Sequence, residues 1–174
     1  MNVKTSQLPT GYQLKEGILS DRASLLQFMI LTYRELFPEQ ESFSHLTQTI
    51  EHYFSPETSL YWVVPVGEKA RGDRQEGIEG KPEKIACLWI GNAIEQINGD
   101  RYTYIFLLYV HPEHHQRGIG SALMHYAHTL ARERGDRQIG VHVFSHNLPA
   151  LNLYKRLGYE TQSLLMVKKL IEPK

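Results

Sequence analysis

The chain has 174 residues, which is enough for one domain with a sizeable core but a small number for two domains. We therefore expect a single domain over residues 1–174. Nineteen lysines and arginines balance nineteen aspartates and glutamates, which favours neither nucleic acid nor a membrane surface as a partner. No stretch approaches the roughly 20 apolar residues of a membrane span. The first residues show no signal-peptide pattern, and the single cysteine, Cys87, can form no disulfide within the chain. Together these features predict a cytoplasmic protein.

The first part of the chain is expected to hold one strand, two helices and a second strand. Ser20 and Asp21 form a typical N-cap pair ahead of apolar residues at helical spacing. Pro38 should end that helix, because the residue before a proline disfavours the helical region. The expected elements are a strand over 12–17, a helix between 20 and 37, a helix over 43–54 and a strand over 60–64.

Residues 67–84 interrupt this pattern. They are polar, with four glycines and alternating charge, so they cannot bury enough apolar surface to order themselves and should form a mobile loop. Beyond the loop, strands over 85–90 and 102–110 should pair in antiparallel fashion across the turn signalled by Asn98-Gly99.

The last part of the chain alternates helices and strands. A helix that opens at Gly120 should run to about Arg134 and end at Gly135, because glycine readily takes the left-handed conformation that closes a helix. The remaining expected elements are a strand over 139–144, a helix over 147–157 that Asn147 caps and Gly158 closes, and a strand over 164–170. This order predicts an α/β fold, a mixed α+β sheet of about seven strands with helices on both faces.

A glycine loop joins the apolar strand that ends at Val110 to the following helix. His111-Pro112 ends the strand, and Gly118-Ile119-Gly120 opens the helix. Such a junction presents backbone N–H groups at the positive end of a helix dipole, which favours anions, and side chains at the two glycines would hold a phosphate away. A dinucleotide fingerprint would need a third glycine at Leu123, and the Gly-Lys-Ser/Thr of a P-loop is absent.

A second element follows downstream and is defined by Asn147, Ala150, Leu153, Tyr154, Gly158 and Tyr159. Together the two elements resemble the GNAT N-acetyltransferase superfamily over roughly residues 102–174. The glycine loop resembles the family's acetyl-CoA diphosphate loop, Arg/Gln-x-x-Gly-x-Gly/Ala. The second element resembles its Asn-x-x-Ala-x-x-Leu-Tyr-x-x-x-Gly-Phe/Tyr motif. The chain departs from the family at His115, where Arg or Gln is usual, although Gln116 and Arg117 can still serve the phosphates.

The resemblance implies a GNAT-like acyl-CoA N-acyltransferase fold with acetyl-CoA as the acyl donor. In that fold the strands before and after the glycine-loop helix splay apart, and pantetheine enters the splay and bonds to the chain. The residues implied in binding the donor are Leu108, Tyr109, Val110, His115, Gln116, Arg117, Gly118, Ile119, Gly120, Ser121 and Asn147. No metal is expected, because the nine histidines match no common metal-binding spacing.

The resemblance also implies Tyr154 as the catalytic residue, acting on the departing thiolate. A phenol has a reference pKa of about 10 and a thiol about 8.5, so full proton transfer would be uphill by roughly 2 kcal/mol. A hydrogen bond to the nascent thiolate is therefore sufficient for the role. The alternative for Tyr154 is a ring that only packs on the sheet. Backbone N–H groups near 108–110 are expected to stabilise the oxyanion.

A general base is not identified by the motifs. The strand over 102–110 carries no carboxylate; its expected alternation places Tyr104, Phe106 and Leu108 on one side and Ile105, Leu107 and Tyr109 on the other. The candidates are Glu35, Glu39 and Glu41 near the first helix–helix loop, or His111 acting through water. Each of them also fits a solvated surface charge.

The leading hypothesis is an N-acetyltransferase that transfers acetyl from acetyl-CoA to a primary amine of a small molecule or peptide by direct attack. The alternatives are a non-catalytic GNAT-fold module that binds acyl-CoA or regulates, and a thiol- or nucleotide-binding protein. Aromatic residues in the first half favour an acceptor with an apolar or aromatic body. The acceptor, the acyl chain length and the oligomeric state are not identified, and a homodimer is left open.

Overall fold

The computed structural model describes residues 8–67, 83–168 and 170, and the chain divides into two compact units, residues 1–142 and 143–174. Residues 68–82 of the loop expected over 67–84 lie outside the described residues. The elements of the first unit are β1 (Tyr12–Glu16), η1 (Leu19–Asp21), α1 (Arg22–Leu36), α2 (His45–Tyr53), β2 (Ser59–Pro65), β3 (Ala86–Ile94), β4 (Arg101–Val110), η3 (Pro112–His114), α3 (Ile119–Glu133) and β5 (Ile139–Val141).

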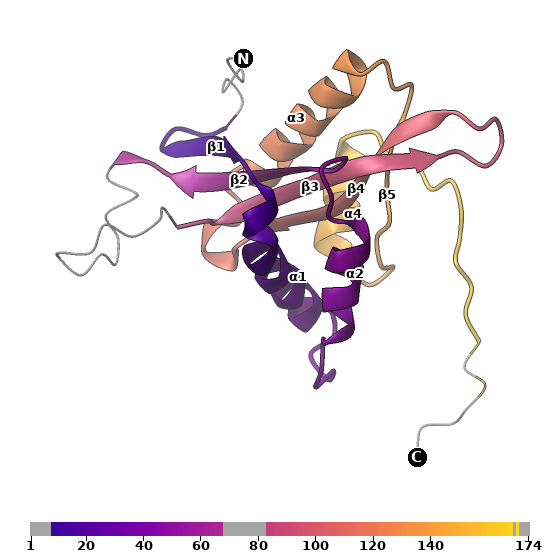
Figure 1. Cartoon of the computed structure of the whole chain (residues 1–174), viewed down its shortest axis with the longest axis horizontal. Coiled ribbons are helices and arrows are strands. Elements are labelled where there is room, and N and C mark those ends of the chain that lie inside the picture. The colour runs from indigo at the N-terminus through magenta and orange to yellow at the C-terminus, as the bar shows by residue number, and fades with distance from the viewer. Residues whose placement is uncertain (1–7, 68–82, 169, 171–174) are drawn as a thin grey trace. The chain divides into compact units, whose positions relative to one another are not determined.

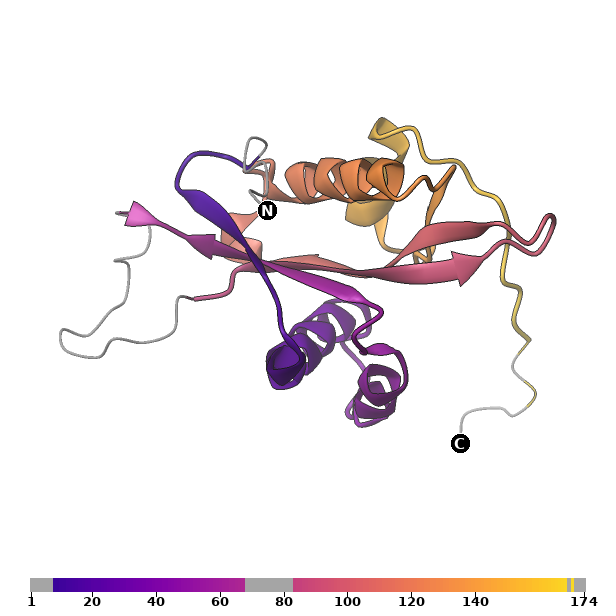
Figure 2. The ribbon, with the colours of Figure 1, turned by 45° about the horizontal axis from the view of Figure 1, so that its top comes forward.

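The first unit is a mixed sheet with helices on both faces, which confirms the predicted fold class. Its strand order is β1-β2-β3-β4-β5, antiparallel throughout except for the parallel pair β4–β5. Figure 1 shows the order of the strands, and Figure 2 shows α1 and α2 on one face and α3 on the other.

The expected count of about seven strands was wrong for the residues that the structure describes, which form five. The strand expected over 139–144 ends at Val141, and the described residues of 164–170 form no strand. Apolar, β-forming residues do not make a strand by themselves, because a strand also needs a neighbouring edge to which its backbone can bond.

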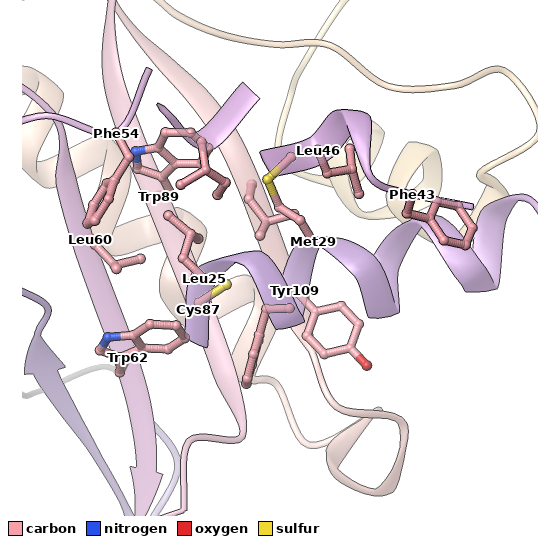
Figure 3. Close-up of a cluster of buried hydrophobic side chains, with 13 residues drawn as sticks. Leu25, Met29, Phe43, Leu46, Phe54, Leu60, Trp62, Cys87, Trp89 and Tyr109 are labelled. Carbon is pink, nitrogen blue, oxygen red and sulfur yellow. The ribbon is translucent and has the colours of Figure 1, made fainter. Parts of the chain in front are cut away.

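The main core lies between the sheet and the pair α1 and α2 (Figure 3). Leu25 and Leu46 from the helices meet Trp62, Cys87 and Trp89 from β2 and β3, and each of these side chains is at most 2% exposed. Burying an apolar side chain of this size stabilises the fold by about 1.5–3 kcal/mol. Burial also raises the pKa of the Cys87 thiol, so this cysteine is a core residue and no nucleophile.

The start of α1 is fixed by a network around Asp21. Its carboxylate accepts hydrogen bonds from Lys84 at 2.6 Å, from the indole of Trp62 at 3.0 Å and from the Ile18 amide at 3.0 Å. The expectation of an N-cap was therefore wrong in its detail, because Asp21 makes no side-chain cap bond to α1. Its carboxylate instead links the helix start to Trp62 of β2 and to Lys84, two residues before β3.

A β-bulge divides β4. Trp89 of β3 pairs with Leu107 and Ile90 pairs with Ile105, so Phe106 is an extra residue on β4. Leu107 belongs to the cluster beneath α1 and α2, whereas the buried Ile105 does not. The simple alternation expected along 102–110 was wrong for this reason: one inserted residue exchanges the two faces of the strand.

The described residues of the second unit contain one helix, α4 (Leu148–Arg156), close to the expected 147–157. Asn147 caps its start, since its side-chain oxygen accepts a hydrogen bond from the Ala150 amide at 3.2 Å. Gly158 ends it in the left-handed conformation at φ 84°, and the Tyr159 amide bonds back to the Tyr154 carbonyl at 3.0 Å. This is a Schellman closure, for which the sequence placed the glycine correctly.

Candidate functional site

The carboxyl end of β4 has an open edge. Within the described part of the chain, β3 pairs with β4 as far as Val110, whereas β5 pairs only with Thr103–Ile105. The backbone groups of a strand alternate between its two edges, so alternate residues between Leu108 and Val110 direct N–H and C=O groups to the open side. This is the place where the family resemblance expects pantetheine to bind as an added strand.

The side chain of His115 lies at the same edge. Its Nε2 is 2.7 Å from the Val110 carbonyl oxygen, and as a protonated nitrogen it donates a hydrogen bond to that oxygen. The residue that departs from the family's Arg or Gln therefore fastens the glycine loop to β4. Because Nε2 of His115 is hydrogen-bonded to the backbone carbonyl of Val110, this side chain helps to hold the conformation of the loop.

The glycine loop contains two residues in the left-handed region, Gln116 at φ 57° and Gly118 at φ 79°. A Cβ at Gly118 would meet only Pro9 Cγ, at 3.9 Å, so it is the conformation that requires glycine here. The first hydrogen bond within α3 runs from the Ala122 amide to the Gly118 carbonyl at 3.0 Å. The amides of residues 119–121 consequently have no acceptor within the helix and lie at the positive end of its dipole.

Arg117 is tied to β1 by a chain of three side chains. Its Nη1 donates to the Tyr12 hydroxyl at 2.9 Å, and that hydroxyl donates in turn to His114 Nδ1 at 2.9 Å. Burial, together with Arg117 and His111, lowers the pKa of His114, which keeps the imidazole neutral as an acceptor. The contact of Tyr12 with this loop was not predicted from the sequence, because Tyr12 lies 105 residues before its partner Arg117.

One of the candidate bases reaches the end of β4. The Tyr109 hydroxyl donates to Glu35 Oε1 at 3.2 Å, with Phe28 edge-on to the Tyr109 ring at 5.3 Å. Burial and the neighbouring carboxylate raise the pKa of Tyr109, so the phenol remains a hydrogen-bond donor. Glu35 itself is exposed on the last turn of α1, as are Glu39 and Glu41 in the connection to α2.

Asn147 and Tyr154 belong to the second unit, whereas residues 108–121 belong to the first. Tyr154 is 7% exposed, and its ring centroid lies 5.4 Å from that of Tyr159. Burial raises the pKa of Tyr154 to about 12. Complete transfer of its proton to a thiolate whose conjugate acid has a pKa of about 8.5 would be uphill by roughly 5 kcal/mol, more than the reference values suggest. Hydrogen bonding is thus the contribution that this phenol can make.

Among the described residues, no three His, Cys, Asp or Glu side chains are grouped closely enough to hold a metal ion. None of the described helices has the length and apolar character needed to cross a bilayer.

The curated proteins that are similar in sequence include two N-acetyltransferases of unknown specificity. An uncharacterized N-acetyltransferase of Methanocaldococcus jannaschii is 34% identical over 101 residues, which are 53% of this chain and 43% of that protein. An uncharacterized N-acetyltransferase of Bacillus subtilis, YycN, is 30% identical over 86 residues, or 49% of this chain and 54% of that protein. The chain spans about half the length of these relatives.

Solved structures with the same fold cover nearly the whole chain. The aminoglycoside 6'-N-acetyltransferase AAC(6')-Ih of Acinetobacter baumannii has a TM-score of 0.63 at 17% identity, over 93% of this chain and 100% of that one. The ribosomal-protein-alanine N-acetyltransferase of Brucella melitensis has a TM-score of 0.63 at 14% identity, over 92% and 99%. The family model described as acetyltransferase (GNAT) family matches residues 26–159. The chain belongs to the acetyltransferase (GNAT) family.

Proposed function

We propose that this protein is an acetyl-CoA-dependent N-acetyltransferase that acts on a primary amine. The observation that supports this most directly is the combination of two features in one unit. Among the described residues, the open edge of β4 at 108–110 is joined by a single short loop to the amides at the start of α3, which have no acceptor within that helix. A molecule that carries both a diphosphate and an extended amide-containing arm matches the two features together.

In this proposal the diphosphate of acetyl-CoA accepts hydrogen bonds from the amides of Ile119, Gly120 and Ser121, where the α3 dipole favours negative charge. Arg117, exposed in the loop, adds a guanidinium from its position at Tyr12. The pantetheine arm bonds to the open edge of residues 108–110. Asn147 would serve the same arm, with its amide nitrogen still able to donate while its oxygen caps α4.

The chemistry then follows direct attack. The neutral amine forms a C–N bond to the acetyl carbonyl, negative charge develops on the carbonyl oxygen, and the C–S bond breaks to release the thiolate of coenzyme A. An N–H of the open β4 edge stabilises the oxygen. The Tyr154 phenol hydrogen-bonds the thiolate, which takes its proton from solvent, and the amine loses one proton to a base.

Glu35 is the base that we assign. Its Oε1 is occupied by the Tyr109 hydroxyl, which holds the carboxylate above the end of β4 and leaves Oε2 to take the proton of the amine. A carboxylate also attracts an amine in its charged ammonium form before reaction. Tyr33, on the same helix, packs against Phe37 and Phe43 with ring centroids 5.9 and 6.5 Å away. These aromatic residues favour an acceptor with an apolar or aromatic body.

The deciding experiment measures release of free coenzyme A from acetyl-CoA with a panel of amines and amino-terminal peptides, beside calorimetry with acetyl-CoA, ATP and NAD. We expect binding of acetyl-CoA alone and amine-dependent release. Binding of acetyl-CoA with no release for any amine would replace the proposal by the alternative, a non-catalytic acyl-CoA-binding or regulatory module. Binding of ATP or NAD instead would contradict both.

A further inference from the structure

The start of β1 lies against the glycine loop. Tyr12 is the first residue of β1, it is 7% exposed, and its backbone pairs with Pro65 of β2, so the sheet fixes its position. The segment before β1 lies beside the loop as well (Figure 2), with Pro9 Cγ 3.9 Å from the point where a Cβ at Gly118 would lie. The start of β1 therefore forms one wall of the loop.

The hydrogen bonds at the Tyr12 hydroxyl run in one direction. His114 Nδ1 accepts the hydroxyl hydrogen at 2.9 Å, which leaves the lone pairs of the phenol oxygen for the Arg117 guanidinium, also at 2.9 Å. The ring of His114 stands edge-on to that of Tyr12, with the centroids 5.7 Å apart. A phenol whose hydrogen is held by an imidazole serves Arg117 as an acceptor.

The partner that holds Arg117 carries no charge. In the part of the chain that the structure describes, no carboxylate forms an ion pair with Arg117. A carboxylate partner would neutralise the guanidinium, whereas a phenol fixes the direction of the side chain and leaves its positive charge for an incoming anion. Because the long side chain is held before the anion arrives, binding costs less conformational entropy.

We propose that Tyr12 is a positioning residue for the acyl donor, because it holds the Arg117 guanidinium at the glycine loop, ready for a phosphate group of coenzyme A. This inference rests on the proposed function, in which the same loop binds the diphosphate. It extends the donor site to the first strand of the sheet. Tyr12 acts through Arg117 and does not itself need to contact the donor.

The test is a double-mutant cycle measured by calorimetry with coenzyme A. Tyr12→Phe keeps the ring but removes the acceptor, and it should raise the dissociation constant by roughly fivefold to tenfold. Arg117→Ala should raise it by about tenfold or more. The double variant should bind no more weakly than Arg117→Ala alone, because Tyr12 acts only through Arg117. A merely structural role of Tyr12 would instead weaken binding by the same factor in both backgrounds.

Tyr61→Phe is the matched control. Tyr61 of β2 is 8% exposed, and its hydroxyl bonds to Tyr126 of α3, so the variant removes a buried phenol group from the same sheet. Its affinity for coenzyme A should stay within about twofold of the wild-type value. In steady-state kinetics, Tyr12→Phe should raise the KM for acetyl-CoA and leave kcat within about twofold, since Arg117 would contact a phosphate and not the reacting carbonyl.

Two kinds of failure are distinguishable. Wild-type affinity in Tyr12→Phe, or losses of affinity that multiply in the double variant, would overturn this inference and leave the proposed function standing. A loss in Tyr61→Phe as large as that in Tyr12→Phe would do the same. A wild-type chain that binds no coenzyme A would instead overturn the proposed function together with this inference.

Discussion

The hydroxyl of Tyr109 on β4 donates a hydrogen bond to the carboxylate of Glu35 on α1, at 3.2 Å and across 74 residues of sequence. Leu108 and Val110, the neighbours of Tyr109, lie on the edge proposed to hold the acyl donor. The bond therefore connects the strand that would hold the thioester to the carboxylate that would receive the proton of the amine.

Glu35→Gln should lower kcat by about 100-fold or more, because general-base catalysis contributes about 10²–10⁴ and an amide cannot take the proton. The KM for acetyl-CoA should stay within about twofold. Tyr109→Phe should lower kcat by less, since the base remains but loses its orientation. Steady-state kinetics with a responsive amine check both, and Glu39→Gln is the control. A Glu35→Gln enzyme with normal kcat would exclude this base.

Tyr154→Phe should lower kcat strongly while acetyl-CoA binds with nearly unchanged affinity, because the lost hydrogen bond is made to the departing thiolate and not to the bound thioester. Tyr159→Phe is the control, since its ring lies 5.4 Å from that of Tyr154 in the same unit. Steady-state kinetics measures kcat, and calorimetry measures the affinity for acetyl-CoA. Unchanged turnover in Tyr154→Phe would remove the assigned role and leave a packing residue.

Gly118→Ala should weaken the binding of coenzyme A by roughly tenfold, because a residue other than glycine resists φ 79° at a cost of about 1–2 kcal/mol. Gly135→Ala is a matched control at the other end of α3, with φ 78° and nothing within 4 Å of the added Cβ. Both substitutions should destabilise the fold to a similar extent. Calorimetry with coenzyme A should show a loss of affinity for Gly118→Ala and none for Gly135→Ala. Equal losses of affinity in the two variants would argue against a diphosphate at the loop.

Asp21→Asn should lower the free energy of unfolding at pH 7 by about 1–3 kcal/mol, through the lost charged hydrogen bonds to Lys84 and Trp62. Burial raises the pKa of Asp21, but the bonds from Lys84, Ile18 and Trp62 outweigh it and hold the pKa below its usual value. The stabilisation is thus present above the unfolded pKa of about 3.9 and is lost as pH falls below it.

Urea unfolding at pH 7 and near pH 3 checks this, because the gap between wild type and Asp21→Asn should narrow at the lower pH. Asp100→Asn is the control, since Asp100 is half-exposed and lies 3.9 Å from Arg137. A gap that stays constant between the two pH values would show that the charge of Asp21 is not what stabilises the start of α1.

Features set by neighbouring residues were predictable from the sequence. The cap at Asn147 and the closure at Gly158 depend on residues within one helical turn, and the glycine loop at Gly118 depends on its own dihedral angles. Features set by distant residues were not. No local pattern places Tyr12 against Arg117, or reveals that Phe106 is a bulge, because both depend on which strands lie side by side.

The bulge at Phe106 also constrains how this strand can evolve. Because the bulge exchanges the two faces of the strand, deleting one residue there would move Thr103 and Ile105 to the face of the sheet opposite the one on which they are now buried. A substitution in β4 changes the contacts of one side chain. Deletion of a single codon would instead change the face on which every side chain in the amino-terminal half of the strand lies. Selection should accordingly tolerate drift in its composition far more readily than any change in its length.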